Sequence, residues 1–109
     1  MADQNFTMYS GDTQDITVTV VDDDSASVAM TGMSIEWVMA RAPGQTAVVT
    51  KTTDDSDITI SGNTFSFTID PADTTSLDGR YYHEAEATDG GGDIATVMVG
   101  WITIVPDTT

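Results

Sequence analysis

A repeated alternation of apolar and polar residues in short segments constrains this chain more than any other feature. Between residues 16 and 21, for example, Ile16, Val18 and Val20 alternate with a second set made mainly of threonine. A period of two directs the apolar set to one face of a β-strand, and β-branched residues suit that pleated surface. Clusters of Gly, Asp, Ser and Pro separate such segments along the chain. The pattern predicts an all-β protein whose strands pair as antiparallel neighbours across short turns.

The positions of the strands follow from the same pattern. We expect strands at residues 5–9, 16–21, 35–39, 47–52, 58–60, 65–69, 81–88 and 94–105. The segment 47–52 has the weakest signal and fits an edge strand, and residues 61–63 form a good hairpin turn. The one helical signal spans residues 70–77, where Asp70 suits the cap, Pro71 the first helical position and Asp73 the first turn. It predicts one or two helical turns that link two strands.

The length of 109 residues fits one domain that spans the whole chain, with residues 106–109 as a frayed tail. A chain of this size folds without disulfides, and the absence of cysteine favours folding in a reducing cytoplasm. The first residues lack the basic region and apolar core of a signal peptide, and no apolar run reaches membrane-spanning length. We therefore expect a protein that is made in the cytoplasm and has no membrane partner.

Charge limits the possible partners. The net charge is −15, because 18 acidic residues face only three strong bases, Arg41, Lys51 and Arg80. A surface this negative repels phosphate backbones, so we expect no nucleic-acid partner and favour a basic or neutral docking surface. The three bases are candidate interface contacts because they are scarce. The alternative is that they form ordinary surface salt bridges, which contribute little to stability.

Two features fit one particular kind of sandwich. Trp37 lies in the third strong segment, where immunoglobulin-like sandwiches keep a buried Trp. Residues 77–81 resemble the tyrosine corner, in which a Tyr such as Tyr81 enters the penultimate strand and bonds back to upstream backbone. His83 stands where antibody-type domains have Cys, so the resemblance concerns architecture and not antibody kinship. We expect an immunoglobulin-like antiparallel β-sandwich of about seven to eight strands, with Trp37 and Tyr81 as structural residues.

Several short motifs extend this comparison over nearly the full chain. In order, they are Gly11-Asp12-Thr13 ahead of Ile16-Thr17-Val18, Asp70-Pro71-Ala72-Asp73-Thr74, Gly79-Arg80-Tyr81-Tyr82-His83-Glu84, Thr88-Asp89-Gly90, and Gly100-Trp101-Ile102-Thr103-Ile104-Val105-Pro106-Asp107. In this order and spacing the chain resembles a family of small immunoglobulin-like structural proteins of tailed bacteriophages. The resemblance implies a virion component with no enzymatic site, either a head decoration (cement) protein or a tail or baseplate accessory.

The resemblance also implies partners. They would be the major capsid protein or another virion protein, bound by repeated copies that form a homo-oligomer or a multivalent array. We expect a capsid decoration protein that stabilises the head shell. The alternatives are a tail or baseplate module, and a carbohydrate-binding or host-adhesion domain. The adhesion hypothesis predicts an exposed aromatic patch with calcium at an Asp-rich loop.

The side chains that could catalyse a reaction or bind a metal do not form a recognisable enzyme site in the sequence. His83, the only histidine, is without the companions that a metal site or a hydrolytic triad needs, so a buried structural role is favoured. Calcium is the one cofactor considered, and its candidate ligands are Asp22, Asp24, Asp55 and Asp57. Their spacing does not match the Asp-x-Asp-x-Asp-Gly loop of calcium sites, which favours solvated turns instead. We expect no enzymatic activity.

Two aromatic residues remain open to two interpretations. Tyr82 and Trp101 could be exposed, where they would stack on a sugar or anchor a protein interface. Trp101 alternates with Val99 and Thr103, and the periodicity of this segment favours a place in the core. Trp101 is therefore both a core candidate and an interface candidate.

Overall fold

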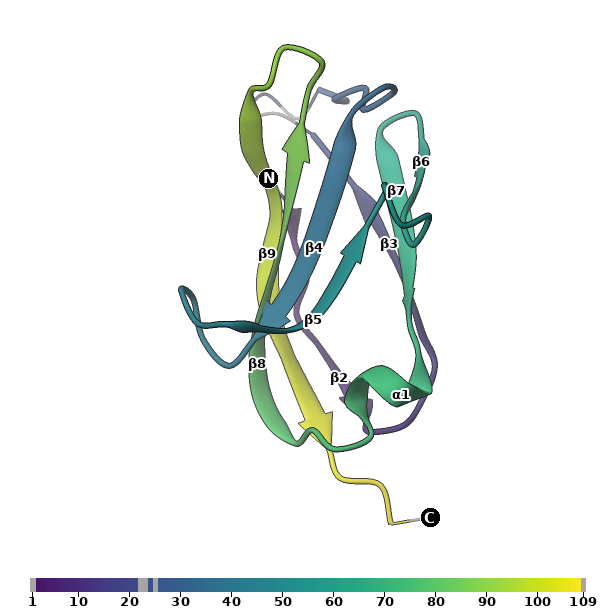
Figure 1. Ribbon diagram of the computed structural model, residues 1–109, viewed down its shortest axis with the longest axis vertical. Coiled ribbons are helices and arrows are strands. Elements are labelled where there is room, and N and C mark those ends of the chain that lie inside the picture. Colours follow the sequence, from purple (N-terminus) through teal and green to yellow (C-terminus); the bar gives the residue numbers. More distant parts are fainter. Residues whose placement is uncertain (1, 22–23, 25, 109) are drawn as a thin grey trace.

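The computed structural model describes residues 2–21, 24 and 26–108 and is a sandwich of two β-sheets (Figure 1). The larger sheet has the order β1 (Ala2–Asp3), β9 (Ile94–Val105), β8 (Gly79–Thr88), β4 (Ser34–Ala40), β5 (Ala47–Thr52), and β2 (Phe6–Tyr9) also pairs with β9. The smaller sheet has the order β3 (Gln14–Thr19), β7 (Thr64–Ile69), β6 (Thr59–Ser61). A short helix, α1 (Pro71–Thr74), links β7 to β8. The expected all-β sandwich with one helical turn is confirmed.

The N-terminal strands depart from the expected antiparallel pattern. β1 and β2 run parallel to β9, whereas the other strand pairs are antiparallel. Between β1 and β2 the contact continues, because the backbone N–H of Gln4 donates to the carbonyl of Val99 at 2.9 Å. The backbone N–H of Ser10 likewise donates to the carbonyl of Val105 at 2.9 Å. The N-terminal segment thus covers the long edge of β9. Left unpaired, this edge could pair with another chain and promote aggregation.

The core lies between the two sheets, as the alternation predicts. Its largest fully buried hydrophobic side chains are Trp37, Phe65, Met30, Ile35, Met39, Ile69, Met98, Ile102 and Ile104. Trp37 of β4 packs on Phe67 of β7 with ring centroids 4.6 Å apart, so this pair joins the two sheets. The threonines of β3, Thr17 and Thr19, are exposed on the opposite face.

The edge strand and the hairpin lie where the sequence predicted them. β5 pairs only with β4 and is the edge strand that we expected. β6 and β7 form the expected hairpin, closed by Gly62 and Asn63. The segment 16–21 is a strand only as far as Thr19, but Val20 remains buried and its backbone N–H donates to the carbonyl of Asn63 at 2.8 Å. Tertiary hydrogen bonding therefore continues beyond the regular strand.

A partly buried ion pair attaches α1 to the edge strand. Lys51 of β5 places its Nζ atom 2.8 Å from the Asp73 carboxylate and 3.1 Å from that of Asp70. Burial lowers the pKa of Lys51, but the hydrogen bonds and charges of Asp73 and Asp70 raise it by more, so the net pKa is raised. Lys51 is only 8% exposed, and the prediction that it is an interface contact is wrong.

Tyr81 is buried at the start of β8, but its hydroxyl forms no hydrogen bond with the described residues. The back-bond of a tyrosine corner is therefore absent from this part of the chain. Arg41 contacts this corner at two points. Its guanidinium lies 4.6 Å from the centroid of the Tyr81 ring, and its Nη1 donates to the carbonyl of Asp78 at 3.1 Å.

The C-terminal tail leaves the sandwich beyond β9 (Figure 1). Asp107 belongs to the segment expected to fray, yet its backbone N–H donates to Ser10 Oγ at 3.2 Å. Part of the tail is thus bonded to the turn that follows β2. Among the described residues, no helix has the length and apolar character needed to cross a bilayer.

Candidate functional site

The inward face of β8 carries a closed polar cluster. His83 has no exposed surface, and its Nδ1 accepts a hydrogen bond from Trp37 Nε1 at 3.0 Å. On the other side of the ring, Nε2 lies 2.6 Å from the carbonyl oxygen of Gln4. We call Gln4, Trp37 and His83 the buried histidine cluster. It joins the N-terminal segment to the centre of the larger sheet.

The bonding fixes the protonation state of His83. An indole N–H only donates, so Nδ1 must be an unprotonated acceptor, and Nε2 carries the proton that it donates to Gln4. The ring is therefore neutral. Burial lowers the pKa of His83, and the hydrogen bond to Gln4 only partly offsets this effect. Because both ring nitrogens are engaged, His83 has the structural role that the sequence favoured.

Gly100 makes room for this cluster. It lies opposite His83 in the β8–β9 pairing and is itself buried. A Cβ atom built on Gly100 would overlap the carbonyl oxygen of Gln4 and would lie 2.9 Å from His83 Nε2. Only glycine allows the N-terminal backbone to approach the histidine this closely.

The outward face of the same strands carries a second, open cluster. Trp101 is half-buried there, and Tyr82, its direct neighbour across the β8–β9 pairing, packs edge-on against it with ring centroids 5.4 Å apart. The guanidinium carbon of Arg80 lies 4.0 Å from the centroid of the Trp101 ring. We call Arg80, Tyr82 and Trp101 the arginine–aromatic cluster. The expectation that Trp101 belongs to the core is wrong.

A groove borders the arginine–aromatic cluster. Its volume is about 310 Å³, and it runs between the N-terminal strand β2 and the outward side chains of β8 and β9. Its lining residues are Asn5, Phe6, Thr7, Arg80, Trp101 and Thr103. The Asn5 side-chain oxygen accepts a hydrogen bond from the backbone N–H of Trp101 at 2.9 Å, which fixes one wall. This groove and its cluster form the candidate docking site.

The cluster contains two of the four predicted interface residues, Arg80 and Trp101. The other two make internal contacts: Lys51 is in the partly buried ion pair with α1, and Arg41 packs on Tyr81 and bonds Asp78. These polar contacts within the chain, which charge counting does not reveal, separate Lys51 and Arg41 from Arg80.

The calcium candidates do not converge in the described part of the chain. Asp22 lies outside the described residues, and Asp24 is exposed in a turn. Asp55 accepts a hydrogen bond from the Thr52 hydroxyl at 3.1 Å, and Asp57 is exposed two residues further on. Among the described residues, no three His, Asp or Glu side chains form a group that could hold a metal ion.

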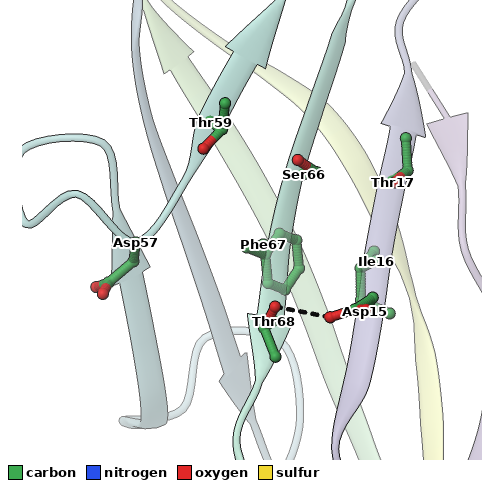
Figure 2. A pocket seen from close by; sticks show the side chains of 8 residues that line it. All are labelled: Asp15, Ile16, Thr17, Asp57, Thr59, Ser66, Phe67 and Thr68. Carbon is green, nitrogen blue, oxygen red and sulfur yellow. Dashed lines mark hydrogen bonds between the residues drawn. The ribbon is translucent and has the colours of Figure 1, made fainter.

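A second hollow, of about 310 Å³, lies on the outer face of the smaller sheet (Figure 2). Its lining residues are Asp15, Ile16, Thr17, Asp57, Thr59, Ser66, Phe67 and Thr68. Asp15 accepts a hydrogen bond from the Thr68 hydroxyl at 2.7 Å, whereas the Asp57 carboxylate points away from this pair (Figure 2). The hydroxyl groups and two carboxylates of this lining fit a solvated β-surface, its one aromatic residue, Phe67, is buried in the core, and no cation lines it.

Neither a family model nor a curated protein matches this chain. The assignment of function therefore depends on the geometry above and on the motifs in the sequence.

The sequence did not point to Gln4 or Gly100, nor to Asn5, Thr7 and Thr103 as walls of the groove. All of them come together through the parallel pairing of the N-terminal segment with β9. The only signal available was the glycine itself, since Gly within a strand often marks a close backbone approach.

Proposed function

We propose that this protein is a non-enzymatic structural component of a bacteriophage virion, and most specifically a decoration protein that binds and stabilises the capsid shell. The phage motifs in the sequence support the virion assignment, and the immunoglobulin-like sandwich agrees with the fold that they imply. The observation that carries the proposal is the arginine–aromatic cluster on the outward face of the larger sheet.

This cluster has the composition of a protein-binding anchor. Trp, Tyr and Arg are the residue types that dominate binding energy at protein interfaces, where they sit at the centre of the contact. Here one of each is gathered on one sheet face of an otherwise acidic molecule. The sandwich behind it is a single packed core, so the cluster is presented on a rigid base.

A carbohydrate-binding role has weaker support from the same geometry. Sugars stack on open aromatic faces, but the Arg80 guanidinium lies over the Trp101 ring at 4.0 Å and the Tyr82 ring contacts it edge-on. A sugar would have to displace Arg80. A protein partner uses the stacked arginine directly, because its N–H groups remain at the surface.

The proposed mechanism is cementing by many copies. Each sandwich would contact capsid subunits through the outward face of its larger sheet, and repeated copies would bridge neighbouring subunits. Individually modest contacts then add through multivalency. The acidic remainder of the surface would stay solvated and keep free copies apart.

Cryo-electron microscopy of the particle that carries this protein tests the proposal. Density in a regular array over the capsid shell, absent from particles that lack the gene, is the expected result. Density only at the neck, tail or baseplate would replace the decoration function by the tail-module alternative, which shares the fold and motifs. A particle without such density would contradict both.

A further inference from the structure

Arg80 differs from the other two strong bases in having no polar partner. Lys51 is bonded to two carboxylates, and Arg41 donates to a backbone carbonyl. The Arg80 side chain forms no ion pair or hydrogen bond with any described residue, although the chain has 18 acidic side chains. Its guanidinium carbon instead lies over the Trp101 ring, 4.0 Å from the centroid. An exposed guanidinium of this kind keeps its N–H donors available to a partner.

The surroundings of Arg80 suit an anion that also accepts hydrogen bonds from hydroxyl groups. Thr103 is directly opposite Arg80 in the β8–β9 pairing, and Thr7 is directly opposite Thr103 in the β2–β9 pairing. Both threonines are exposed and line the groove together with Asn5. One row across three strands therefore presents a guanidinium and two hydroxyl groups to the same groove.

We propose that the Arg80 groove binds a carboxylate side chain, from Asp or Glu, on the protein to which this domain docks. The inference rests on the proposed function and identifies the chemistry of its contact. A guanidinium fork matches a carboxylate with two parallel hydrogen bonds. Burial of the pair would occur on docking, since the groove is open to solvent in the free protein.

Charge decides which carrier of the anion fits. A phosphate polymer would bring many negative charges close to a molecule of net charge −15, and the repulsion would outweigh one arginine. A single carboxylate on a neutral or basic protein surface pairs with Arg80 and leaves the rest of that surface attracted to the acidic domain. The predicted partner surface is therefore basic or neutral around one exposed Asp or Glu.

The cluster also orders Arg80 before binding. Stacking on Trp101 restricts the long side chain, and Tyr82 supports the indole from its edge. Less side-chain freedom is then lost on docking, which favours affinity. Lys would keep the charge at this position but has neither the planar stack nor the two-pronged donor geometry.

The first part of the test compares variants for binding to phage heads prepared without this protein, measured by co-sedimentation. Arg80→Gln should weaken binding by about 30-fold or more, the range for truncating one partner of a buried charge pair. Arg80→Lys should lie between Arg80→Gln and the wild type. Asn63→Asp, at the hairpin of the smaller sheet, makes the same change in net charge and should bind as the wild type does.

The second part tests whether binding requires a carboxylate on the phage head. Heads are treated with a carbodiimide and glycinamide, which converts exposed carboxylates into neutral amides and makes the shell more positive. General electrostatics would then strengthen binding of this acidic protein. The proposal expects the opposite for the wild type, a loss comparable to that of Arg80→Gln, and no further loss for the Arg80→Gln protein.

Other results would overturn the carboxylate contact, the decoration function or the identity of the partner. If the wild type binds heads but Arg80→Gln binds equally well, or amidation strengthens wild-type binding, the carboxylate contact is wrong and the proposed function stands. If the wild type does not bind heads, the decoration function is wrong and the inference falls with it. An Arg80-dependent dimer of the free protein in sedimentation velocity would assign the groove to a second copy of this chain and overturn the proposal.

Discussion

The two faces of β8 carry similar residues that are used in opposite ways. On the inward face, His83 meets Trp37, and each polar atom of the pair has a partner. On the outward face, one residue away, Tyr82 meets Trp101, and Arg80 stacks on the indole without a polar partner among the described residues. The inward cluster is closed by the N-terminal segment, whereas the outward cluster faces a groove.

This difference separates stability from binding. Unsatisfied buried polar groups cost free energy, so the inward cluster must be complete within the chain. An exposed donor set is hydrated in the free protein and becomes useful only when a partner buries it. We therefore expect changes on the inward face to alter the stability of the free protein, and changes on the outward face to alter binding.

The largest loss of stability should come from Trp37→Phe, and Trp101→Phe is its matched control. Trp37→Phe removes the donor to His83 and leaves a void in the core, and should destabilise the protein by about 3 kcal/mol. Trp101→Phe, on the outward face, should cost less than about 1 kcal/mol. Urea unfolding of both variants measures the difference. Equal losses would break the distinction between the two faces.

Gly100→Ala should destabilise the protein by about 2 kcal/mol, because the added methyl group would overlap the Gln4 carbonyl. Gly90→Ala is the control, since a Cβ atom at Gly90 would meet no atom within 4 Å. It should change stability by less than about 0.5 kcal/mol. Thermal unfolding distinguishes the two, and a neutral Gly100→Ala would show that the N-terminal segment does not depend on this close approach.

Stability should also depend on pH through His83. Its pKa is lowered in the folded protein, so the unfolded chain binds a proton more readily. The contribution of the neutral ring is fully present above the unfolded pKa of about 6.5 and is lost as the pH falls toward the folded value. The slope should reach at most about 1.4 kcal/mol per pH unit. Urea unfolding at several pH values between about 7.5 and 5 measures it.

His83→Gln is the control for that titration. A glutamine amide accepts and donates hydrogen bonds but has no proton to gain in this range. The variant should lose the His83 part of the slope. An unchanged slope would mean that other groups produce the pH dependence.

Replacement of Lys51 by Met keeps the buried stem and removes the charge. Loss of the ion pair with Asp73 and Asp70 should destabilise the protein by about 1 kcal/mol, since the 60% exposure of the Asp70 side chain limits its share. The wild type should lose the same contribution only at high pH, because the pKa of Lys51 is raised. Urea unfolding at neutral pH checks the expected loss. A more stable Lys51→Met protein would show that desolvation of the lysine outweighs the ion pair.

The smallest effect is expected for Arg80→Gln in the free protein. Arg80 has no bonded partner among the described residues, so stability should change by less than about 0.5 kcal/mol. Thermal unfolding measures this change. A loss above about 1 kcal/mol would indicate a structural role for the stack on Trp101.

The sequence predicts the fold well because alternation is a local signal. The strand at 94–105 and the hairpin at 61–63 were both visible in the order of residues. The direction of the first strand was not, because parallel pairing with β9 joins residues almost a full chain length apart. That pairing brings Gln4 to His83 and builds one wall of the groove.

Trp101 illustrates why the site was harder to predict. In β9 the inward set holds Met98, Gly100, Ile102 and Ile104, and the outward set holds Val99, Trp101, Thr103 and Val105, so both faces are largely apolar. Periodicity alone therefore does not assign Trp101 to one face. The inward face lacks a side chain at Gly100 because the Gln4 carbonyl occupies that space, a fact that only the tertiary structure reveals.

Hydroxyl-radical footprinting of the protein on phage heads measures whether the outward face of the larger sheet is covered on binding. Oxidation of Tyr82 and Trp101 is measured by mass spectrometry for the free protein and for the protein saturated with heads. Both residues should lose most of their reactivity on binding, because the outward face of the larger sheet is proposed as the docking surface. Bound protein in which Tyr82 and Trp101 react as fast as in the free protein would contradict that proposal.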